Sequence, residues 1–204
     1  MNPVGEFLIL FILLLPVMTV HEFAHGWVAS KLGDNTARYS GRVTLNPLAH
    51  IDPFWTFLLP LLLYLSSRFF IAAAKPVPIN YWSLKNPKRD TALIGASGPL
   101  ANFIFAVVLS LILKILPLNQ ALGFVFHQLI FLNIMLGVFN LVPVPPLDGS
   151  RILIGLLPAD LSAQYARIEP YGLIIVSILF ITGLLGSVIW PLIQSITMFL
   201  IGSF

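Results

Sequence analysis

Two histidines and a glutamate lie close together in an otherwise apolar part of the chain. His21, Glu22 and His25 form an H-E-F-A-H sequence inside the apolar run from Val4 to Leu32. On a helix, this spacing places both imidazoles on one face, where they can bind one zinc ion, and leaves the glutamate free to act as a general base toward an attacking water. Polar residues solvated at a helix end would be a simpler explanation, but ionisable groups inside a membrane segment are costly and indicate function by default. The pattern therefore predicts a zinc hydrolase whose active site lies within the bilayer.

A zinc site of this kind needs a third protein ligand, and Asp148 is the acid whose surroundings best suit that task. It follows an apolar helix and a segment that contains Pro143, Pro145 and Pro146. Prolines stop a helix and leave carbonyls that hydrocarbon cannot satisfy, so such backbone lies at membrane depth only beside protein or a water-filled cavity. Hydrolysis needs the same access for water. Taken alone, the Pro-Pro-Leu-Asp-Gly sequence is explained equally well by an ordinary turn at a helix end.

The composition places the chain in a membrane. Of its 204 residues, 58% are hydrophobic and only 9% are charged, whereas about a quarter of the residues in soluble domains are charged. The formal net charge of +3 does not indicate nucleic-acid binding, because the basic residues are spread over loops that flank membrane segments. The sequence has no cysteine, which excludes disulfides and thiolate metal ligands. The first apolar run carries the H-E-x-x-H sequence and lacks a basic start, so we expect it to be retained as structure and not removed as a signal peptide.

Five apolar blocks predict an all-α polytopic membrane protein, a bundle of about four to six membrane helices. The last block is long enough for one full span plus a shorter piece, with a break expected after Gly186 or Pro191. The chain contains no internal repeat and no linker to an appended domain, so residues 1–204 are expected to form a single domain. The apolar blocks are Glu6–Leu32, Phe54–Phe70, Ala92–Leu116, Ala121–Val142 and Tyr171–Phe204.

Short membrane-associated β-hairpin segments are expected beside the helices. Residues Ala37 to Leu45 alternate between polar and apolar types well enough to predict a short hairpin. The edge of this hairpin, or the proline-containing segment from Ile71 to Ile79, could pair with an extended substrate strand. An amphipathic stretch from Arg151 to Arg167 precedes the last apolar block.

The basic residues and the metal ligands together predict the topology. If Phe54–Phe70 dips into the membrane and returns, ten of the eleven Lys and Arg residues share one side and only Lys114 lies on the other. A full crossing would divide these residues four to seven, against the positive-inside rule. The two histidines lie toward the C-terminal end of the first block, and Asp148 lies just past the C-terminal end of the fourth, so these two blocks must run parallel to share one metal ion. Both conditions require Phe54–Phe70 to be re-entrant, and they place His127 on the outer side, away from the metal.

Three motifs, taken together, carry a family resemblance. They are the H-E-F-A-H sequence in the first span, Gly-Pro-Leu-Ala-Asn-Phe from Gly98, and Asn-Leu-Val-Pro-Val-Pro-Pro-Leu-Asp-Gly from Asn140. In this order, and from the first span through Arg151, the chain resembles the site-2 protease family of intramembrane zinc metalloproteases. It is similar to the minimal form of that family, which has neither a PDZ domain nor a CBS domain.

The resemblance implies one zinc ion per chain, held by His21, His25 and Asp148, with Glu22 as the catalytic base. By the same similarity, Asn140 faces the site, where it polarises the scissile carbonyl or grips the substrate backbone. The implied function is hydrolysis of peptide bonds within or near transmembrane helices of membrane-protein substrates in the lipid bilayer, with no nucleic-acid partner. The implied location is a bacterial-type cytoplasmic membrane, with the active site toward the cytosol.

Two other functions are compatible with parts of the pattern. A zinc-binding membrane transporter could use the same ligands, but it would not need Glu22 and would carry acidic or histidine residues on several spans. A catalytically silent membrane scaffold descended from a protease would be expected to lose Glu22 or Asp148, and both are present. Asn102 is an amide inside the membrane that needs a partner, and bonding between helices explains it as well as a catalytic role does.

Overall fold

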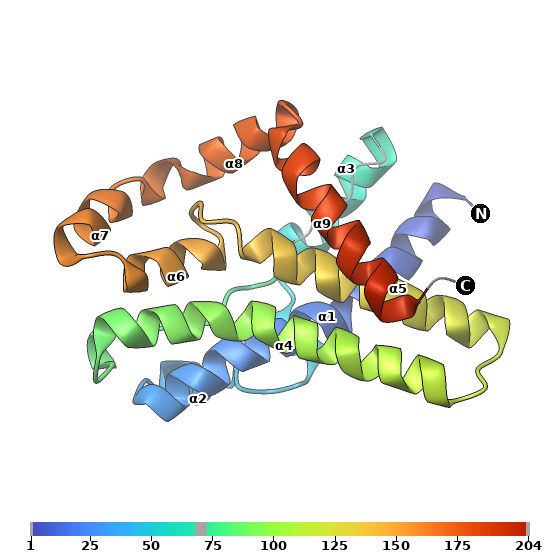
Figure 1. The fold of residues 1–204 in the computed structure, drawn as a ribbon, viewed down its shortest axis with the longest axis horizontal. Coiled ribbons are helices and arrows are strands. Elements are labelled where there is room, and N and C mark those ends of the chain that lie inside the picture. The colour runs from blue at the N-terminus through green and yellow to red at the C-terminus, as the bar shows by residue number, and fades with distance from the viewer. Residues whose placement is uncertain (1, 68–72, 203–204) are drawn as a thin grey trace.

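Three long apolar helices form the centre of the molecule in the computed structural model, which describes residues 2–67 and 73–202. Helices α1 (Pro3–Leu32) and α5 (Gln120–Asn140) run in the same direction, and α4 (Pro87–Ile115) packs against both in the opposite direction (Figure 1). A helix satisfies its backbone hydrogen bonds internally, so it is the form that an apolar chain can adopt in hydrocarbon. The parallel course of α1 and α5 brings their C-terminal parts to the same end of the bundle, as predicted.

Asparagine side chains explain where two of these helices begin. Oδ1 of Asn2 accepts a hydrogen bond of 2.7 Å from the amide of Gly5 in the first turn of α1. Oδ1 of Asn119 accepts a bond of 2.9 Å from the amide of Leu122 in the first turn of α5. Such caps satisfy amides that have no partner inside the helix, and Pro at the first position of α1 and α4 removes a further one.

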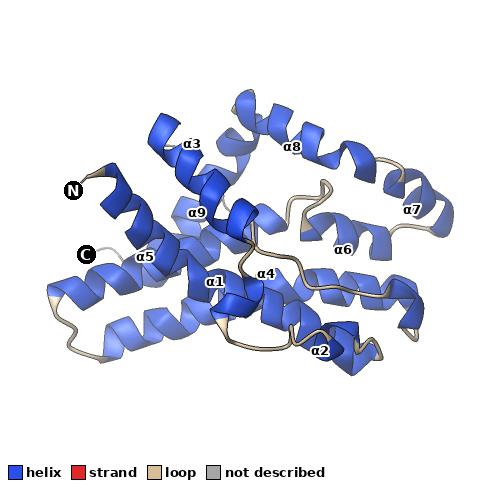
Figure 2. Cartoon of the chain, turned by 180° about the vertical axis from the view of Figure 1, so that it is seen from behind, coloured by secondary structure: helices blue, strands red, loops and turns tan. Residues whose placement is uncertain are grey.

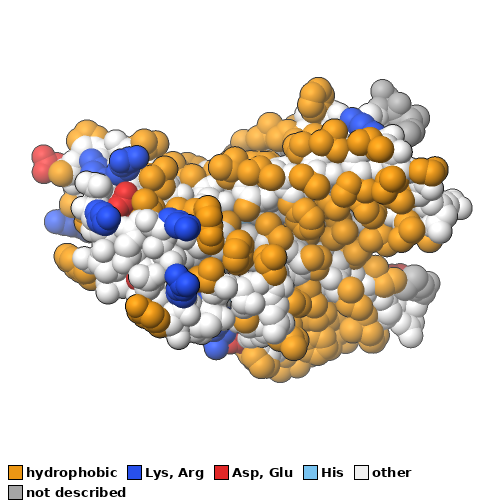
Figure 3. All heavy atoms as spheres, turned by 90° about the horizontal axis from the view of Figure 1, so that it is seen from below, with side chains coloured by type: hydrophobic (Ala, Val, Ile, Leu, Met, Phe, Trp, Pro, Cys, Tyr) orange, Lys and Arg blue, Asp and Glu red, His pale blue; other side chains and the backbone are white. Residues whose placement is uncertain are grey.

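Five helical segments of the described residues are long and apolar enough to cross a membrane, which confirms the predicted polytopic all-α architecture. Their outward faces carry large apolar side chains that are more than half exposed, such as Ile104, Leu111 and Leu173. Figure 3 shows hydrophobic side chains over most of one face and most of the visible basic side chains toward one end. The chain is therefore an integral membrane protein. The five segments are Pro3–Leu32, Pro87–Ile115, Gln120–Asn140, Ala159–Ile181 and Leu184–Ile201.

Shorter elements surround the central helices. α6 lies directly against α4 because Gly95 has no side chain: a Cβ there would lie 2.8 Å from the Cβ of Arg151 and 3.0 Å from the carbonyl oxygen of Asp148. α9 packs on α4 and α5, where Ile193 joins the buried cluster around Ile130 and Ile134. The shorter elements are α2 (Thr36–Tyr39), α3 (Leu59–Ser67), α6 (Asp148–Leu156), α7 (Ala159–Ala166), α8 (Gly172–Ile181) and α9 (Leu184–Ile201), with 3-10 turns at Pro47–His50, Tyr81–Ser83 and Glu169–Tyr171.

The predicted β-hairpin segments are wrong. The described residues contain no strand (Figure 2), and the segment predicted as a hairpin begins with the short helix α2. The carboxylate of Asp34 starts this turn, because it accepts hydrogen bonds from the amide (2.9 Å) and the hydroxyl (2.5 Å) of Thr36. Burial raises the pKa of Asp34, but the bonds from Thr36 and from the amide of Asn80 (2.7 Å) outweigh it and hold that pKa below its usual value. A charged Asp34 therefore fixes the backbone in a helical turn.

The residues that follow the second apolar block lie beside the start of that block. It forms a π-helical turn, Pro53–Leu58, followed by α3. The amide of Ala73 donates to the carbonyl of Trp55 (3.3 Å), and the hydroxyl of Thr56 donates to the carbonyl of Ala73 (2.7 Å). The described chain thus resumes beside the start of the helix that it left, as a re-entrant segment requires. The end of the predicted block, residues 68–70, lies outside the described residues.

The last apolar block breaks earlier than predicted. α8 and α9 meet at Gly183, whose φ of 72° lies in the left-handed region that ends a helix and favours glycine. The predicted break after Gly186 or Pro191 is wrong, because both residues lie inside α9. The shorter piece of this block, α8, therefore precedes the full-length helix.

Candidate metal centre

Three potential metal ligands converge where α1, α4 and α6 meet. His21 and His25 lie one turn apart on α1, and Asp148 is the first residue of α6. Nε2 of His21 lies 3.1 Å from Nε2 of His25, and Oδ2 of Asp148 lies 3.0 Å and 3.2 Å from these two nitrogens. Within the described part of the chain, these side chains form a group whose ligand atoms are close enough to hold one metal ion.

The hydrogen-bond partners of the two Nδ1 atoms, which face away from Asp148, determine which nitrogen of each imidazole carries the proton. Nδ1 of His25 is 2.8 Å from the carbonyl oxygen of Ile94, and Nδ1 of His21 is 2.6 Å from Oδ1 of Asn102. Both partners can only accept, so both Nδ1 atoms must donate. A neutral imidazole that carries its proton on Nδ1 has a bare lone pair on Nε2. The two Nε2 lone pairs therefore point into the space that they share with the carboxylate.

This space is surrounded by acceptors and has no donor. Two Nε2 lone pairs cannot form a hydrogen bond with each other, and Oδ2 of Asp148 is buried without a hydrogen bond. Such a cluster is unfavourable unless a cation neutralises it. Two neutral imidazoles and one carboxylate form a ligand set that zinc uses in hydrolytic sites, where three protein ligands leave a coordination position open. The residues present therefore fit a zinc ion.

Helix α4 contacts the ligand atoms through a glycine. A Cβ at Gly98 would lie 2.4 Å from Nε2 of His25 and 2.7 Å from Nε2 of His21. No side chain, not even that of alanine, fits at this position without displacing a ligand. Gly98 opens the second motif on which the family resemblance rests, and the structure gives a physical reason for it.

The site is more open on the side of Asp148. The imidazoles of His21 and His25 are 7% and 9% exposed, whereas the Asp148 side chain is 18% exposed. Asp148 follows the proline-containing segment that the sequence indicates as an irregular stretch beside a cavity. Of the three side chains, the one on α6 is therefore the most exposed.

Glu22 lies beside the ligands and is held by a neighbouring segment. Its Oε2 accepts a hydrogen bond of 3.0 Å from the amide of Val77. The same segment is fixed at the amide of Lys75, which donates to the carbonyl of His50 (2.9 Å), and at the amide of Asn80 on Asp34. Glu22 itself is partly exposed. The carboxylate expected to act as a base is thus fixed by one donor and remains partly accessible.

Asn140, predicted as a site residue, lies at the C-terminal end of α5 and is half-buried. Its Nδ2 donates to the carbonyl of Leu136 one turn earlier (3.0 Å), so its amide bonds within its own helix. Asn140 is not in the group of three ligands. Its contact with a substrate stays a prediction.

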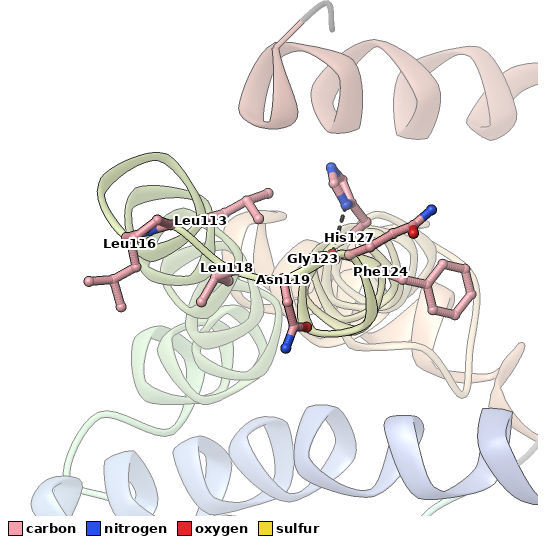
Figure 4. Close-up of a pocket in the computed structure, with 9 residues that line it drawn as sticks. Leu113, Leu116, Leu118, Asn119, Gly123, Phe124 and His127 are labelled. Atoms are coloured by element: carbon pink, nitrogen blue, oxygen red, sulfur yellow. Dashed lines mark hydrogen bonds between the residues drawn. The ribbon is translucent and has the colours of Figure 1, made fainter.

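His50 and His127 lie apart from the three-ligand group. Nε2 of His50 bonds to the carbonyl of Thr44 in a loop (2.9 Å). His127 bonds through Nδ1 to the carbonyl of Gly123 (2.7 Å) and lines an open pocket of about 480 Å³ at the connection between α4 and α5 (Figure 4). This connection follows the C-terminal end of α4, whereas the ligands contact its N-terminal half.

The partners of the outer imidazole nitrogens were the part of the site least visible in the sequence. For Asn102 the sequence indicates only an amide inside the membrane that needs a partner, and it does not indicate that this partner is His21. Its own partner Asn133 was not singled out, and neither was the carbonyl of Ile94. The available signal for Asn133 was its polar side chain within an apolar span.

A bundle of membrane helices that brings an H-E-x-x-H helix and a distant aspartate close together is an arrangement typical of membrane-embedded zinc metalloproteases. The chain belongs to peptidase family M50, whose family model matches residues 8–128 and 117–183. This is the site-2 protease family that the three motifs resemble, and the match confirms that prediction.

Curated relatives of the chain carry names of zinc metalloproteases. The chain is 37% identical over 195 residues to the "Putative zinc metalloprotease YwhC" of Bacillus subtilis, covering 91% of this chain and 86% of the relative. It is 28% identical over 187 residues to the "Putative zinc metalloprotease Rip2" of Mycolicibacterium smegmatis, covering 88% and 69%. It is 29% identical over 161 residues to the "Zinc metalloprotease MJ0392" of Methanocaldococcus jannaschii, covering 79% of this chain but only 37% of the relative. No solved structure matches the chain.

Proposed function

We propose that this protein hydrolyses peptide bonds within or near transmembrane helices of membrane-protein substrates. In this proposal His21, His25 and Asp148 bind one zinc ion and Glu22 is the general base. The observation that carries the proposal is the group of three converging acceptors on α1 and α6, which lies beside the carboxylate of Glu22 on α1. A transporter would need the ligands but not that carboxylate.

The residues of the chain have separate tasks in the reaction. Zinc, when bound, supplies Lewis acidity that lowers the pKa of water and polarises a carbonyl. Glu22 takes a proton from the attacking water and later passes it to the leaving amine. The amide of Val77 holds one carboxylate oxygen of Glu22, which orients the base without occupying its other oxygen.

The substrate must present an unfolded peptide bond. A transmembrane helix uses its carbonyls in its own hydrogen bonds, so it must unwind locally before cleavage. The segment around Val77 remains the candidate for strand pairing with the unwound substrate. Its amides at Lys75 and Val77 bond toward the protein, while Pro76 and Pro78 have no amide hydrogen. The free edge of this segment therefore offers mainly carbonyls, which would accept from substrate amides.

Purified protein reconstituted with zinc in liposomes should cleave a labelled single-span membrane protein. Removing zinc with a chelator should stop cleavage, and adding zinc back should restore it, because the three acceptors need a cation to act. Product fragments are measured by mass spectrometry, which also locates the cut. Cleavage that persists in metal-free protein would contradict the proposal, as would zinc-dependent cuts only in soluble loops far from the membrane.

The active site is proposed to face the cytosol. Exposed basic side chains gather at the end of the molecule that carries α2 and the start of α4, as Figure 3 shows for that end, and positive loops favour the cytosolic side. The contact of Ala73 with Trp55 supports the re-entrant second block that this topology requires.

Single cysteines test this topology, because the native chain has none. Cysteines at Ser40, Ser83 and Gln164 should be protected in intact cells from a membrane-impermeant thiol reagent, and a cysteine at Gln120 should be labelled. All four positions are exposed. Labelling of Ser83 and Gln120 together, with Ser40 protected, would show that the second block crosses the membrane. Protection of Gln120 with labelling of the other three would place the active site outside.

A further inference from the structure

Two fully buried amide side chains connect three membrane helices behind the metal site. Asn102 of α4 and Asn133 of α5 are both 0% exposed. Oδ1 of Asn102 lies 2.6 Å from Nδ1 of His21, and its Nδ2 lies 2.8 Å from Oδ1 of Asn133. A continuous hydrogen-bonded chain thus runs from α5 through α4 to a predicted zinc ligand on α1. It lies inside membrane spans, where water cannot replace a lost partner.

Backbone carbonyls fix the direction of every bond in this chain. Nδ2 of Asn133 donates to the carbonyl of Leu129 (2.8 Å), so Oδ1 of Asn133 must face Asn102. Nδ2 of Asn102 then donates both to Asn133 and to the carbonyl of Val17 (3.1 Å). Only Oδ1 of Asn102 remains for His21, and it can only accept. The proton of the His21 imidazole is therefore held on Nδ1.

Asp148 would otherwise attract this proton. Its Oδ2 lies 3.0 Å from Nε2 of His21, and it is buried without a hydrogen bond. A proton on Nε2 would satisfy that carboxylate, and it would also remove the lone pair that a metal needs. Asn102 competes with Asp148 for the same proton from the opposite side of the ring.

We propose that Asn102 and Asn133 are positioning residues of the metal site. Asn133 and the carbonyl of Val17 orient the Asn102 amide, and Asn102 keeps the His21 proton on Nδ1 and its Nε2 lone pair free. The inference rests on the proposed metal site and gives two amides of that site a role. Hydrogen bonds of this kind to metal-binding histidines typically change metal affinity about 10- to 100-fold.

The first test reads the position of the proton without any metal. Nitrogen-15 spectra of histidine-labelled, metal-free protein distinguish a protonated from a bare ring nitrogen, and the His21 signals are assigned by their loss in His21→Ala. The native protein should show His21 protonated on Nδ1. Asn102→Leu should move the proton to Nε2, because no acceptor then faces Nδ1, and Asn133→Leu should give a mixture of the two forms.

The second test measures zinc affinity by competition with a chelator. Asn102→Leu should weaken binding about 10-fold or more, and Asn133→Leu should weaken it less. The control is Ser110→Ala, which removes another buried bond from α4, the one donated by the Ser110 hydroxyl to the carbonyl of Leu200 (2.5 Å). It should lower thermal stability and leave both zinc affinity and the His21 spectrum unchanged.

The outcomes separate this inference from the proposed function. A His21 proton that stays on Nδ1 in Asn102→Leu, or equal losses of zinc affinity in Asn102→Leu and Ser110→Ala, would overturn the positioning role while the metal site stands. If Asn102→Leu does not fold, Asn133→Leu carries the same test at a smaller effect. A native chain that binds zinc no better than His21→Ala would contradict the metal site itself, whatever the spectra show.

Discussion

Replacement of Glu22 by glutamine is expected to leave about one zinc ion per chain and to abolish peptide cleavage. Glutamine retains an oxygen that can accept from the amide of Val77, so the local structure should persist. It cannot take a proton from the attacking water, and general-base catalysis is worth about 10²–10⁴-fold. Zinc content is measured by elemental analysis of purified protein, and cleavage is measured on a reconstituted single-span substrate.

Glu6→Gln is the matched control for this experiment. Glu6 lies on the same helix α1, about four to five turns before the metal ligands, where its carboxylate accepts from the hydroxyl of Tyr64 (3.0 Å). The same substitution there should leave zinc content and cleavage near native values. Cleavage by Glu22→Gln at an appreciable fraction of the native rate would remove Glu22 from the role of base. Loss of zinc from Glu22→Gln would instead indicate that it supports the metal.

The chemistry-bearing residues could be predicted because the membrane makes polar groups conspicuous. His21, Glu22 and His25 stand inside an apolar run, and their spacing alone places the imidazoles on one helix face. Asp148 stands out through the proline-containing segment before it and through the family resemblance, and its pairing with the histidines then requires two parallel helices with one antiparallel helix between them. The structure brings His21, His25 and Asp148 together.

The inner faces of the helices could not be predicted in the same way. Lipid is as apolar as a protein core, so a membrane helix is apolar on all sides and its periodicity does not reveal its buried face. Asn133 illustrates this limit: its place toward α4 depends on how α5 packs, and no local pattern marks it. The need for a glycine at position 98 likewise becomes visible only when α4 is seen to pack against the two imidazoles.

The β-hairpin prediction failed for a different physical reason. Alternation of residue types from Ala37 to Leu45 suits a strand, but Asp34 imposes a helical turn through its bonds to Thr36. That carboxylate is fixed in turn by the amide of Asn80, which is remote in sequence. A contact of this kind overrides local preference, and a single sequence does not display it.

Replacement of Asp148 by alanine is expected to lower zinc affinity and cleavage together. The change removes the one charged ligand of the group and leaves two imidazoles, which cannot neutralise a divalent ion. The loss of affinity should exceed the roughly 10- to 100-fold effect of an outer hydrogen-bonding partner. Zinc retention is measured by elemental analysis after dialysis against a chelator, and cleavage is measured on the same reconstituted substrate. This pattern differs from that of Glu22→Gln, which should lose cleavage alone.

The other histidines and acids provide the controls for Asp148→Ala. His127 lines the pocket between α4 and α5, apart from the three-ligand group, so His127→Ala should keep zinc content and cleavage near native values. His50 bonds to the carbonyl of Thr44, and Asp52 accepts from the amides of Phe54 and Trp55 at the start of a π-helical turn, so neither is free to approach the ligands. Full zinc content in Asp148→Ala, together with its loss in His50→Ala or Asp52→Ala, would show that the metal lies on the loop side of α1. The parallel arrangement of α1 and α5 would then have no role in metal binding, and the group formed by Asp148 and the two histidines would not be the metal site.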